Sequence, residues 1–259
     1  MPRGPDVELV SSRLLARFPH GFSTRRGGVS PAPWDSLNLG GAVGDDPGRV
    51  AENWRRLEAA TGLAFARVQQ VHGARVVTAD APSAPCDEAD AVVSRTPGVA
   101  ACISVADCVP VLIADPTSGA VAAVHAGWRG TVARAAAAAV EALTARGGAR
   151  PRELLAAIGP SIGPCCYEVS PDLAARFEEA FGAGVVDRSR SAPRLDLWEA
   201  NVRALGAAGL LPERIDALRR CTACEDRLFF SHRRDAGATG RQAAWIAPGA
   251  RDIAGRAVP

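Results

Sequence analysis

Short apolar runs follow one another through the middle of the chain, between residues 66 and 125. They are rich in Val, Ile and Ala and are separated by Gly, Pro or Asp, which is the pattern of β-strands. The run VPVLIAD, for example, has no polar alternation, as expected of a strand buried on both faces. Strands are therefore predicted over residues 66–72, 74–80, 89–95, 98–105, 109–115 and 119–125, and again over 153–159 and 227–233.

Helical patterns lie on either side of this block of strands. Asp46 suits a helix N-cap, Pro47 the first turn and Gly62 the end, which predicts a helix over 46–62. The same tests predict helices over residues 130–148, 170–182 and 195–209. Because the strands are grouped and do not alternate strictly with helices, the expected fold class is α+β. No break in composition divides the chain, so we expect a single domain over residues 1–259, with mixed β-sheets flanked by helices.

Composition and charge exclude several classes of partner and chemistry. The 30 basic and 28 acidic residues leave a formal charge of +2, which is too small to indicate a nucleic-acid or membrane-surface partner. Every basic residue is an arginine, so a lysine nucleophile or Schiff base is excluded. No G-x-G-x-x-G motif opens a helix, and no Walker-type loop is present. The amino terminus lacks the apolar stretch of a signal peptide and no run approaches transmembrane length, so we expect a cytoplasmic protein.

The seven cysteines are odd in number and lie in apolar or motif segments, so a disulfide framework is not expected. Cys165 and Cys166 are adjacent, and direct neighbours rarely bridge each other. The C-x-x-C of residues 221–224 has no second pair and no thioredoxin-like βαβ pattern around it, so it is only a weak candidate for redox or metal work. Cys86 and Cys102 are interpreted as packing or surface residues.

His72, Cys108, His125 and His232 all lie where an apolar run ends or is interrupted. Strand ends hold side chains rigidly while letting them leave the core, which suits metal ligands. Two imidazoles and a thiolate, from His72, Cys108 and His125, could bind Zn²⁺ and leave a fourth position for water or substrate. Bound zinc makes a hydroxide available near neutral pH or polarises a substrate oxygen.

Two other interpretations of the same residues stay open. Cys108 and His125 could act as nucleophile and base, with Asp107 or a backbone amide orienting the imidazole. Alternatively, His72 and His125 are hydrogen-bonded residues at strand ends and Cys108 is a small core residue. Metal content separates the first two interpretations, because a thiolate committed to zinc is a poorer nucleophile.

Three loops rich in Gly and Pro, over 23–40, 156–170 and 229–241, offer binding groups. Closely spaced glycines let the backbone approach a ligand, and an arginine can hold an anion by a bidentate contact. Composition alone fits solvated surface turns equally well. The polar side chains of these loops include Arg25, Arg26, Tyr167, Glu168, Ser231, His232, Arg233, Arg234 and Arg241.

In chain order, the motifs STRRGGVS…SLNLG, QQVHG, ADCVPVLI, AVHAGWRGT, IGPSIGPCCYEV, CT and FFSHRRD…TGR resemble those of the YfiH-type laccase-domain family. Its members have been labelled laccase-domain proteins, polyphenol oxidases and purine nucleoside phosphorylases. The resemblance extends from about residue 20 to about residue 246. It implies an α+β fold and a catalytic zinc held by His72, Cys108 and His125, with Cu²⁺ able to substitute. Cys224 is not part of the family pattern.

The resemblance further implies phosphorolysis of adenosine, inosine, guanosine and methylthioadenosine, with adenosine deamination as an added activity. The partners are then a small-molecule nucleoside and phosphate. Deamination needs an activated water at the purine C6, and phosphorolysis needs phosphate held beside the ribose C1′, for which arginine is suited. Asp107 joins the three metal ligands as a catalytic candidate. The residues expected to contact substrate are Arg25, Asn38, Arg129, His232 and Arg233.

Three other functions remain as alternatives. A cysteine–histidine amidase acting on peptidoglycan precursors would use Cys108 without a metal. A copper-dependent polyphenol oxidase is disfavoured because four histidines cannot build the several clusters of a multicopper enzyme. A non-enzymatic binding module leaves the His/Cys/His set unexplained. The sequence does not indicate the oligomeric state.

Overall fold

The computed structural model describes residues 7–83, 87–145 and 149–249. The α-helices of these residues are α1 (Pro47–Thr61), α2 (Trp128–Val132), α3 (Ala135–Thr144), α4 (Pro171–Phe181) and α5 (Leu197–Ala207). Short 3-10 turns occur at Arg13–Leu15, Pro151–Glu153 and Pro212–Arg214. The strands are β1 (Leu9–Val10), β2 (His20–Ser23), β3 (Ala64–Ala66), β4 (Val76–Ala79), β5 (Ala91–Ser94), β6 (Val99–Val105), β7 (Val109–Ala114), β8 (Val121–Ala126), β9 (Leu155–Ile158), β10 (Val186–Asp187), β11 (Arg194–Leu195), β12 (Ile215–Ala217) and β13 (Gln242–Ile246).

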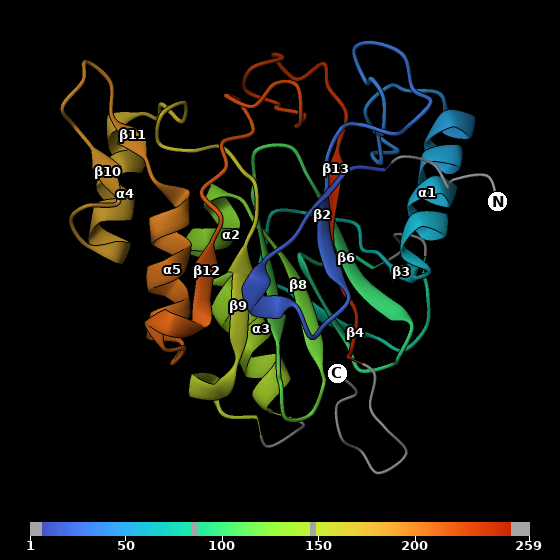
Figure 1. The fold of residues 1–259 in the computed structure, drawn as a ribbon. Coiled ribbons are helices and arrows are strands. Elements are labelled where there is room, and N and C mark those ends of the chain that lie inside the picture. Colours follow the sequence, from blue (N-terminus) through green and yellow to red (C-terminus); the bar gives the residue numbers. More distant parts are fainter. Residues whose placement is uncertain (1–6, 84–86, 146–148, 250–259) are drawn as a thin grey trace.

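Most of the strands form two mixed sheets that pack face to face (Figure 1). One sheet has the order β12-β9-β7-β8-β5-β4 and the other β1-β2-β13-β6-β3. In the first sheet the pairs β4–β5 and β9–β12 are parallel and the rest antiparallel. A separate antiparallel pair, β10 and β11, lies beside α4 at the edge of the molecule.

Helices cover the outer face of each sheet. Leu143 of α3 packs into the core on the outer face of the six-stranded sheet. On the far side, Leu57 of α1 packs with Trp245 of β13. Between the sheets, Leu112 of β7 lies in the same core as Ile103 of β6. The layer order is therefore α–β–β–α, which explains why the central strands are apolar without alternation.

The expected α+β class with mixed sheets flanked by helices is confirmed. The runs from residue 74 to 125, and that over 153–159, contain strands β4 to β9 within a few residues of the predicted bounds. Helix α1 begins after Asp46, whose carboxylate accepts the N–H of Arg49 at 3.0 Å. It ends at Gly62, which has the left-handed φ of 68°. The extent of the single domain, residues 1–259, stays a prediction.

Two predicted elements are interrupted in the structure. The strand predicted over 66–72 ends at Ala66, and the following residues form the loop that carries His72. The helix predicted over 130–148 is wrong as one element, because Arg134 has a φ of 60° and separates α2 from α3. Residues 146–148, including the Gly pair expected to end this helix, lie outside the described residues.

The strand predicted over 227–233 is also wrong. This segment forms turns, although Phe229 and Phe230 are fully buried and account for its apolar pattern. The side chain of Gln242 accepts the N–H of Phe230 at 2.9 Å and donates to its carbonyl oxygen at 3.2 Å. One side-chain amide therefore satisfies both backbone groups that a neighbouring strand would otherwise pair.

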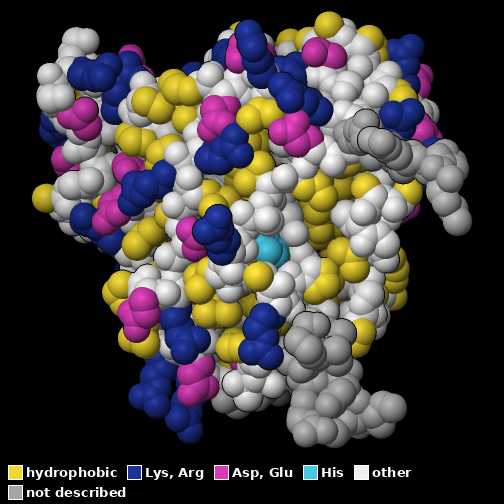
Figure 2. Space-filling model, viewed as in Figure 1, with side chains coloured by type: hydrophobic (Ala, Val, Ile, Leu, Met, Phe, Trp, Pro, Cys, Tyr) yellow, Lys and Arg dark blue, Asp and Glu magenta, His cyan; other side chains and the backbone are white. Residues whose placement is uncertain are grey.

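On the face shown in Figure 2, arginine and acidic side chains are interspersed over the described surface. None of the described helices is long and apolar enough to cross a membrane. The cysteines of the described residues are free thiols, and Cys102 is buried as expected of a packing residue. Cys86 lies outside the described residues.

Candidate metal and active site

Asp90 fixes the loop that carries His72. His72 has a φ of 62°, a left-handed conformation that is uncommon for a residue with a side chain. Its N–H donates to Asp90 Oδ1 at 2.9 Å, and the N–H of Gly73 donates to Asp90 Oδ2 at 2.6 Å. The buried Asp90 carboxylate thus holds a turn that would otherwise be strained.

Strand β8 carries His125 to the same carboxylate. The N–H of His125 donates to the carbonyl oxygen of Asp90 at 2.7 Å, and its Nδ1 lies 2.8 Å from Asp90 Oδ1. The imidazole is only 3% exposed. Because Nδ1 is committed to Asp90, Nε2 is the nitrogen left to bind a ligand.

Cys108 directly precedes β7, which pairs with β8. Val109 lies opposite Ala126 in the antiparallel register, so Cys108 and Gly127 approach each other just beyond the paired residues. A Cβ atom on Gly127 would lie 2.8 Å from Cys108 Sγ and 3.5 Å from His72 Cδ2. Only glycine leaves room at this position for the sulfur and the imidazole together.

The structure brings the three predicted ligands together. One donor atom each from His72, Cys108 and His125 lies within 4.8 Å of the others. The two imidazole rings are 4.9 Å apart at an angle of 77°. Two nitrogens and one sulfur gathered in this way could hold a metal ion such as Zn²⁺ and leave one coordination position open.

The charges in this cluster are strongly coupled. Burial opposes ionisation of Cys108, but the charge and hydrogen bond of His125, with those of His72, outweigh it and lower the pKa of Cys108 to about 6. Burial also opposes the imidazolium of His125, whereas the Cys108 thiolate and Asp90 raise the pKa of His125 to about 9. The site therefore favours a thiolate beside a protonated imidazole, and a bound cation would replace that proton.

Asp107 does not have the role expected of it, which was to orient the imidazole of His125. It also has a left-handed φ, 84°, but its carboxylate does not orient His125, since Asp90 does so. Asp107 Oδ1 accepts the hydroxyl of Thr222 at 2.6 Å, and Oδ2 accepts the N–H of Arg233 at 2.7 Å. Asp107 thus joins the segment that precedes β7 to two points of the long segment between β12 and β13.

A cavity of about 540 Å³ opens beside the three ligands. This volume is within the usual range for a small-molecule site. A second hollow of about 820 Å³ adjoins it, and the two share Gln70, His72, Ser104 and Arg241. The first cavity is lined by the three ligands and by Gln70, Ser104, Val105, Ala106, Asp107, Ile162, Tyr167, His232, Arg233 and Arg241.

The residues expected to contact substrate divide into two groups. His232 and Arg233 line the cavity. Arg25 instead donates to Asp35 in its own loop and to the carbonyl oxygen of Asp226 in the segment between β12 and β13, and the buried Asn38 bonds to Gly40, Asp45 and the N–H of Arg241. Arg129 is exposed, with its guanidinium 4.5 Å from the centre of the Trp128 ring. The structure thus gives Arg25, Asn38 and Arg129 contacts within the chain itself.

Sequence analysis missed two groups that shape the site. Asp90 carries no motif of its own, and only its position before a buried strand sets it apart. The amide of Gln70 bonds to both backbone groups of Ser104 at 2.8 Å, which holds the His72 loop against the end of β6. In both cases the partner is distant in sequence, so only the fold reveals the contact.

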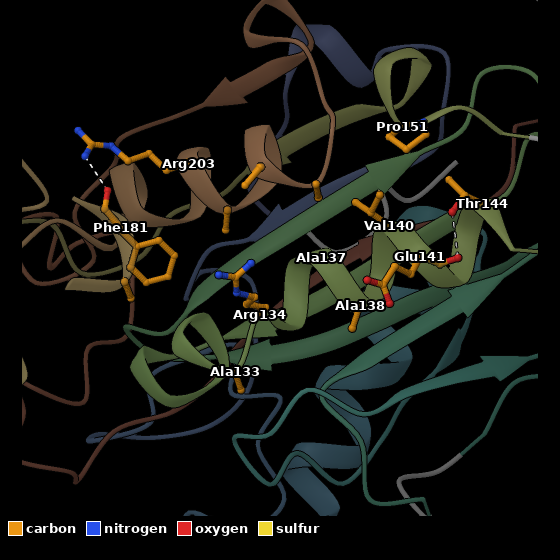
Figure 3. A pocket seen from close by; sticks show the side chains of 14 residues that line it. Ala133, Arg134, Ala137, Ala138, Val140, Glu141, Thr144, Pro151, Phe181 and Arg203 are labelled. Carbon is orange, nitrogen blue, oxygen red and sulfur yellow. Dashed lines mark hydrogen bonds between the residues drawn. The ribbon is translucent and has the colours of Figure 1, made fainter. Parts of the chain in front are cut away.

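A third cavity, of about 640 Å³, lies among α3, α5 and the end of α4, away from these ligands (Figure 3). Its lining is largely alanine. Arg203, at one side, donates to the carbonyl oxygen of Phe181 at 2.8 Å and to that of Ala183 at 2.7 Å. Its guanidinium is therefore engaged, and this cavity offers no comparable donor set.

Comparison with known proteins identifies relatives over most of the chain. The family model described as multi-copper polyphenol oxidoreductase laccase matches residues 19–248. A protein of Deinococcus radiodurans named purine nucleoside phosphorylase is 46% identical over 93% of this chain and 93% of its own. The purine nucleoside phosphorylase SCO2081 of Streptomyces coelicolor is 42% identical over 87% of this chain and 93% of its own.

A solved structure shares the fold. The crystal structure of YlmD from Geobacillus stearothermophilus matches with a TM-score of 0.87 and 34% identity, over 96% of this chain and 98% of that one. The family model, the relatives and the shared fold agree with the motifs found in the sequence. The chain therefore belongs to the YfiH-type laccase-domain family.

Proposed function

We propose that this protein is a zinc-dependent purine nucleoside phosphorylase that also deaminates adenosine. The observation that carries the proposal is the His72/Cys108/His125 donor set, which opens onto a cavity lined by arginines. The names of the D. radiodurans and S. coelicolor relatives support the phosphorylase activity.

Arg233 and Arg241 are suited to bind phosphate. Among the described residues, no carboxylate forms an ion pair with either guanidinium. Burial lowers the pKa of Arg241, although an arginine remains cationic at neutral pH. Arg241 is half-buried and Arg233 is exposed, and a partly buried cation without an ion-pair partner is stabilised by an anionic ligand. In phosphorolysis that phosphate forms a bond to C1′ while the C1′–N9 bond breaks and N9 keeps the electron pair.

The metal ligands are oriented for a cation by the chain itself. Asp90 holds the tautomer and direction of His125, and Gly127 leaves space for Cys108 Sγ. When bound, Zn²⁺ would supply a Lewis acid or a water of lowered pKa. Adenosine deamination requires such a water to add at C6, after which the C6–N bond breaks and ammonia leaves.

The remaining lining fits an uncharged base. Val105, Ala106 and Ile162 contribute apolar surface, and Tyr167 contributes an aromatic ring with Arg233 5.1 Å from its centre. Burial raises the pKa of Tyr167 to about 12, so its hydroxyl stays protonated at neutral pH and can donate a hydrogen bond. A purine can therefore occupy the cavity while phosphate contacts the arginines.

The test is a product analysis of purified, zinc-loaded protein with adenosine. Adenine and ribose 1-phosphate should form only when phosphate is present, and inosine and ammonia should form without phosphate. The Cys108→Ala variant should lose both reactions. Adenine release that does not depend on phosphate, or no release of base, would exclude a phosphorylase.

A cysteine–histidine amidase is a second candidate function. It is favoured by the low pKa of Cys108 and by the Cys108–His125–Asp90 arrangement, which matches a nucleophile, a base and an orienting acid. This function needs no metal. Amidase activity that persists after zinc is removed, and that iodoacetamide abolishes by alkylating Cys108, would favour it over the phosphorylase.

A further inference from the structure

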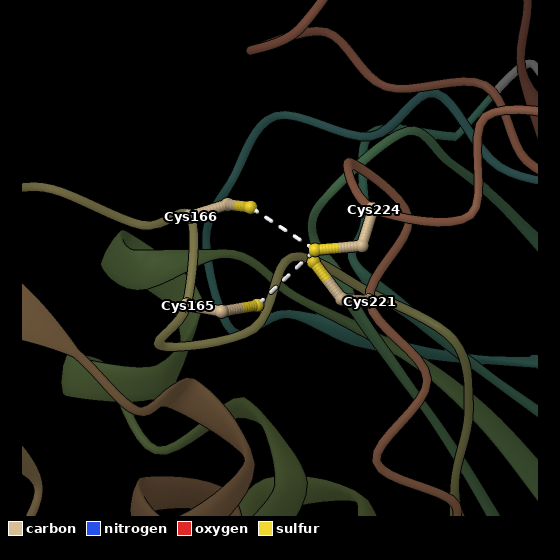
Figure 4. A group of neighbouring side chains, drawn as sticks. All are labelled: Cys165, Cys166, Cys221 and Cys224. Atoms are coloured by element: carbon tan, nitrogen blue, oxygen red, sulfur yellow. Dashed lines mark hydrogen bonds between the residues drawn. The ribbon is translucent and has the colours of Figure 1, made fainter.

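A second cluster of possible metal ligands, which the proposed function does not use, lies in two loops beside the active site. The loop after β9 carries Cys165 and Cys166, and the loop after β12 carries Cys221 and Cys224. The four sulfur atoms lie within 4.8 Å of one another. Figure 4 shows the four side chains pointing toward one common centre. We propose that these cysteines form a second, tetrathiolate metal centre that binds one Zn²⁺ and joins the two loops.

The sulfur separations agree with this geometry. In a tetrahedral zinc site with Zn–S bonds of about 2.3 Å, neighbouring sulfurs lie about 3.8 Å apart. Here Cys224 Sγ lies 3.5 Å from Cys165 Sγ and 3.3 Å from Cys166 Sγ. All four residues are free thiols, and four sulfurs around one point are the donor set that selects zinc over harder cations.

The surroundings support a bound cation. Cys221 and Cys224 have the C-x₂-C spacing common in structural zinc sites. The N–H of Gly163 donates to Cys221 Sγ at 3.3 Å, which is the kind of hydrogen bond that stabilises a ligating thiolate. Cys165 and Cys224 are exposed, so an ion has a path to the centre. The guanidinium of Arg194 donates to the carbonyl oxygen of Cys165 and brings positive charge to an anionic site.

The two loops also form part of the active-site wall. Tyr167 follows Cys166 directly and lines the cavity. Thr222 follows Cys221 and donates to Asp107. The backbones of the loops already meet, because the N–H of Thr222 donates to the carbonyl oxygen of Ser161 at 3.1 Å. A metal bound by both loops would therefore hold Tyr167 and Asp107 in place.

The first test counts metal ions per chain in protein loaded with Zn²⁺ and freed of excess. Wild-type protein and the Cys102→Ala control should each hold two ions, because Cys102 is in neither cluster. Cys224→Ser and Cys108→Ser should each hold one, and the double variant none. A single ion in the wild type that is retained in Cys224→Ser would overturn the second centre.

The second test does not depend on activity, and its alkylation measurement needs no variant. Wild-type protein is alkylated under native, anaerobic conditions with and without a strong chelator, and the cysteine peptides are analysed by mass spectrometry. The four cysteines should be protected by zinc and become alkylated once it is removed. Co²⁺ in place of Zn²⁺ should add the intense thiolate charge-transfer bands of a tetrathiolate site in the Cys108→Ser variant. Alkylation despite bound zinc, or disulfides among the four cysteines, would contradict the proposal.

Discussion

Asp90 is the residue on which the geometry of the proposed His72/Cys108/His125 metal site depends. Its carboxylate accepts the N–H groups of His72 and Gly73 and contacts Nδ1 of His125. Burial opposes ionisation of this group, but the His125 and Gly73 hydrogen bonds lower its pKa, so it is a carboxylate at neutral pH. One buried negative charge thus sets the positions of two metal ligands.

We expect Asp90→Asn to weaken zinc binding by about 10- to 100-fold, because the amide cannot supply the charge and both acceptors. Competition with a chelator of known affinity measures this loss. The measurement uses protein that also carries Cys224→Ser, so that only the His72/Cys108/His125 site binds zinc. Asp115→Asn is the matched control, since Asp115 is equally buried and also accepts backbone N–H groups, from Thr117 and Ser118. Equal zinc affinity in wild type and Asp90→Asn would show that the carboxylate does not organise the site.

Gly127→Ala tests the close contact between backbone and sulfur. The added methyl would meet Cys108 Sγ at 2.8 Å, so the sulfur or the backbone must shift. We expect a loss of stability of about 1–3 kcal/mol and reduced zinc occupancy. Urea unfolding and metal analysis measure the two effects. Gly41→Ala serves as the control, because nothing lies within 4 Å of its added Cβ, and similar behaviour of both variants would contradict the prediction.

At the scale of elements, side-chain amides replace strand pairing at two places beside the site. Gln70 bonds to the backbone of Ser104, and Gln242 bonds to the backbone of Phe230. Each contact fixes a loop against a sheet without adding a strand. The loop after Phe230 carries His232 and Arg233 into the cavity, so Gln242 acts on the site from a distance.

Replacing Gln242 by leucine should leave the buried N–H and C=O of Phe230 unpaired. Each such group costs about 1–3 kcal/mol, so we expect the free energy of unfolding to fall by several kcal/mol. Chemical denaturation measures the change. Gln69→Leu removes an exposed glutamine and should have little effect. A loss as large in Gln69→Leu as in Gln242→Leu would argue against the role of the amide.

Elements whose residues are buried or capped locally could be predicted from the sequence, whereas elements that depend on distant contacts could not. Strands β7 and β8 are buried on both faces, and α1 has a polar cap and a terminal glycine, so local pattern was sufficient. The apolar Phe229 and Phe230 resembled a strand because an apolar pattern indicates only that residues are buried. It does not indicate whether their backbone groups bond to a neighbouring strand or, as here, to a side chain. Likewise, nothing local indicated that Arg134 would interrupt a run of alanines.

In the site, the position of His72, Cys108 and His125 at or beside the ends of apolar runs made them candidates, and the resemblance to the YfiH-type family implied that they form one ligand set. Asp90 was not, since its role exists only once β5 lies beside β8. The four-cysteine cluster was missed for the same reason: Cys166 and Cys221 are far apart in sequence, and neither pair alone forms a complete donor set.

At the scale of the whole molecule, both donor sets join segments that meet only in the folded state. His72 and Cys108 follow β3 and β6 of the five-stranded sheet, whereas His125 lies in β8 of the six-stranded sheet, and the cysteine cluster joins the loops after β9 and β12. Zinc should therefore stabilise the folded chain. At a free zinc concentration 100 times the dissociation constant, each site would contribute about 2.7 kcal/mol.

Calorimetry with and without zinc tests this expectation. The melting temperature should rise with zinc, by about 2–4 °C for each kcal/mol in a chain of this size. Cys108→Ser and Cys224→Ser should each lose part of the rise, and the double variant should lose all of it. A melting temperature that does not respond to zinc in the wild type would mean that neither set binds the ion in the folded state.

The pairing of β7 with β8 brings two of the three proposed zinc ligands together within one local unit. Cys108 and His125 are 17 residues apart and belong to one hairpin, so they can meet as soon as this local unit forms. His72 and Asp90 join them only when β4 and β5 have docked beside β8. Before these strands dock, the hairpin brings together only two of the three donors of this site. Tight retention of an ion at this site would therefore report that the hairpin and the docked strands have come together.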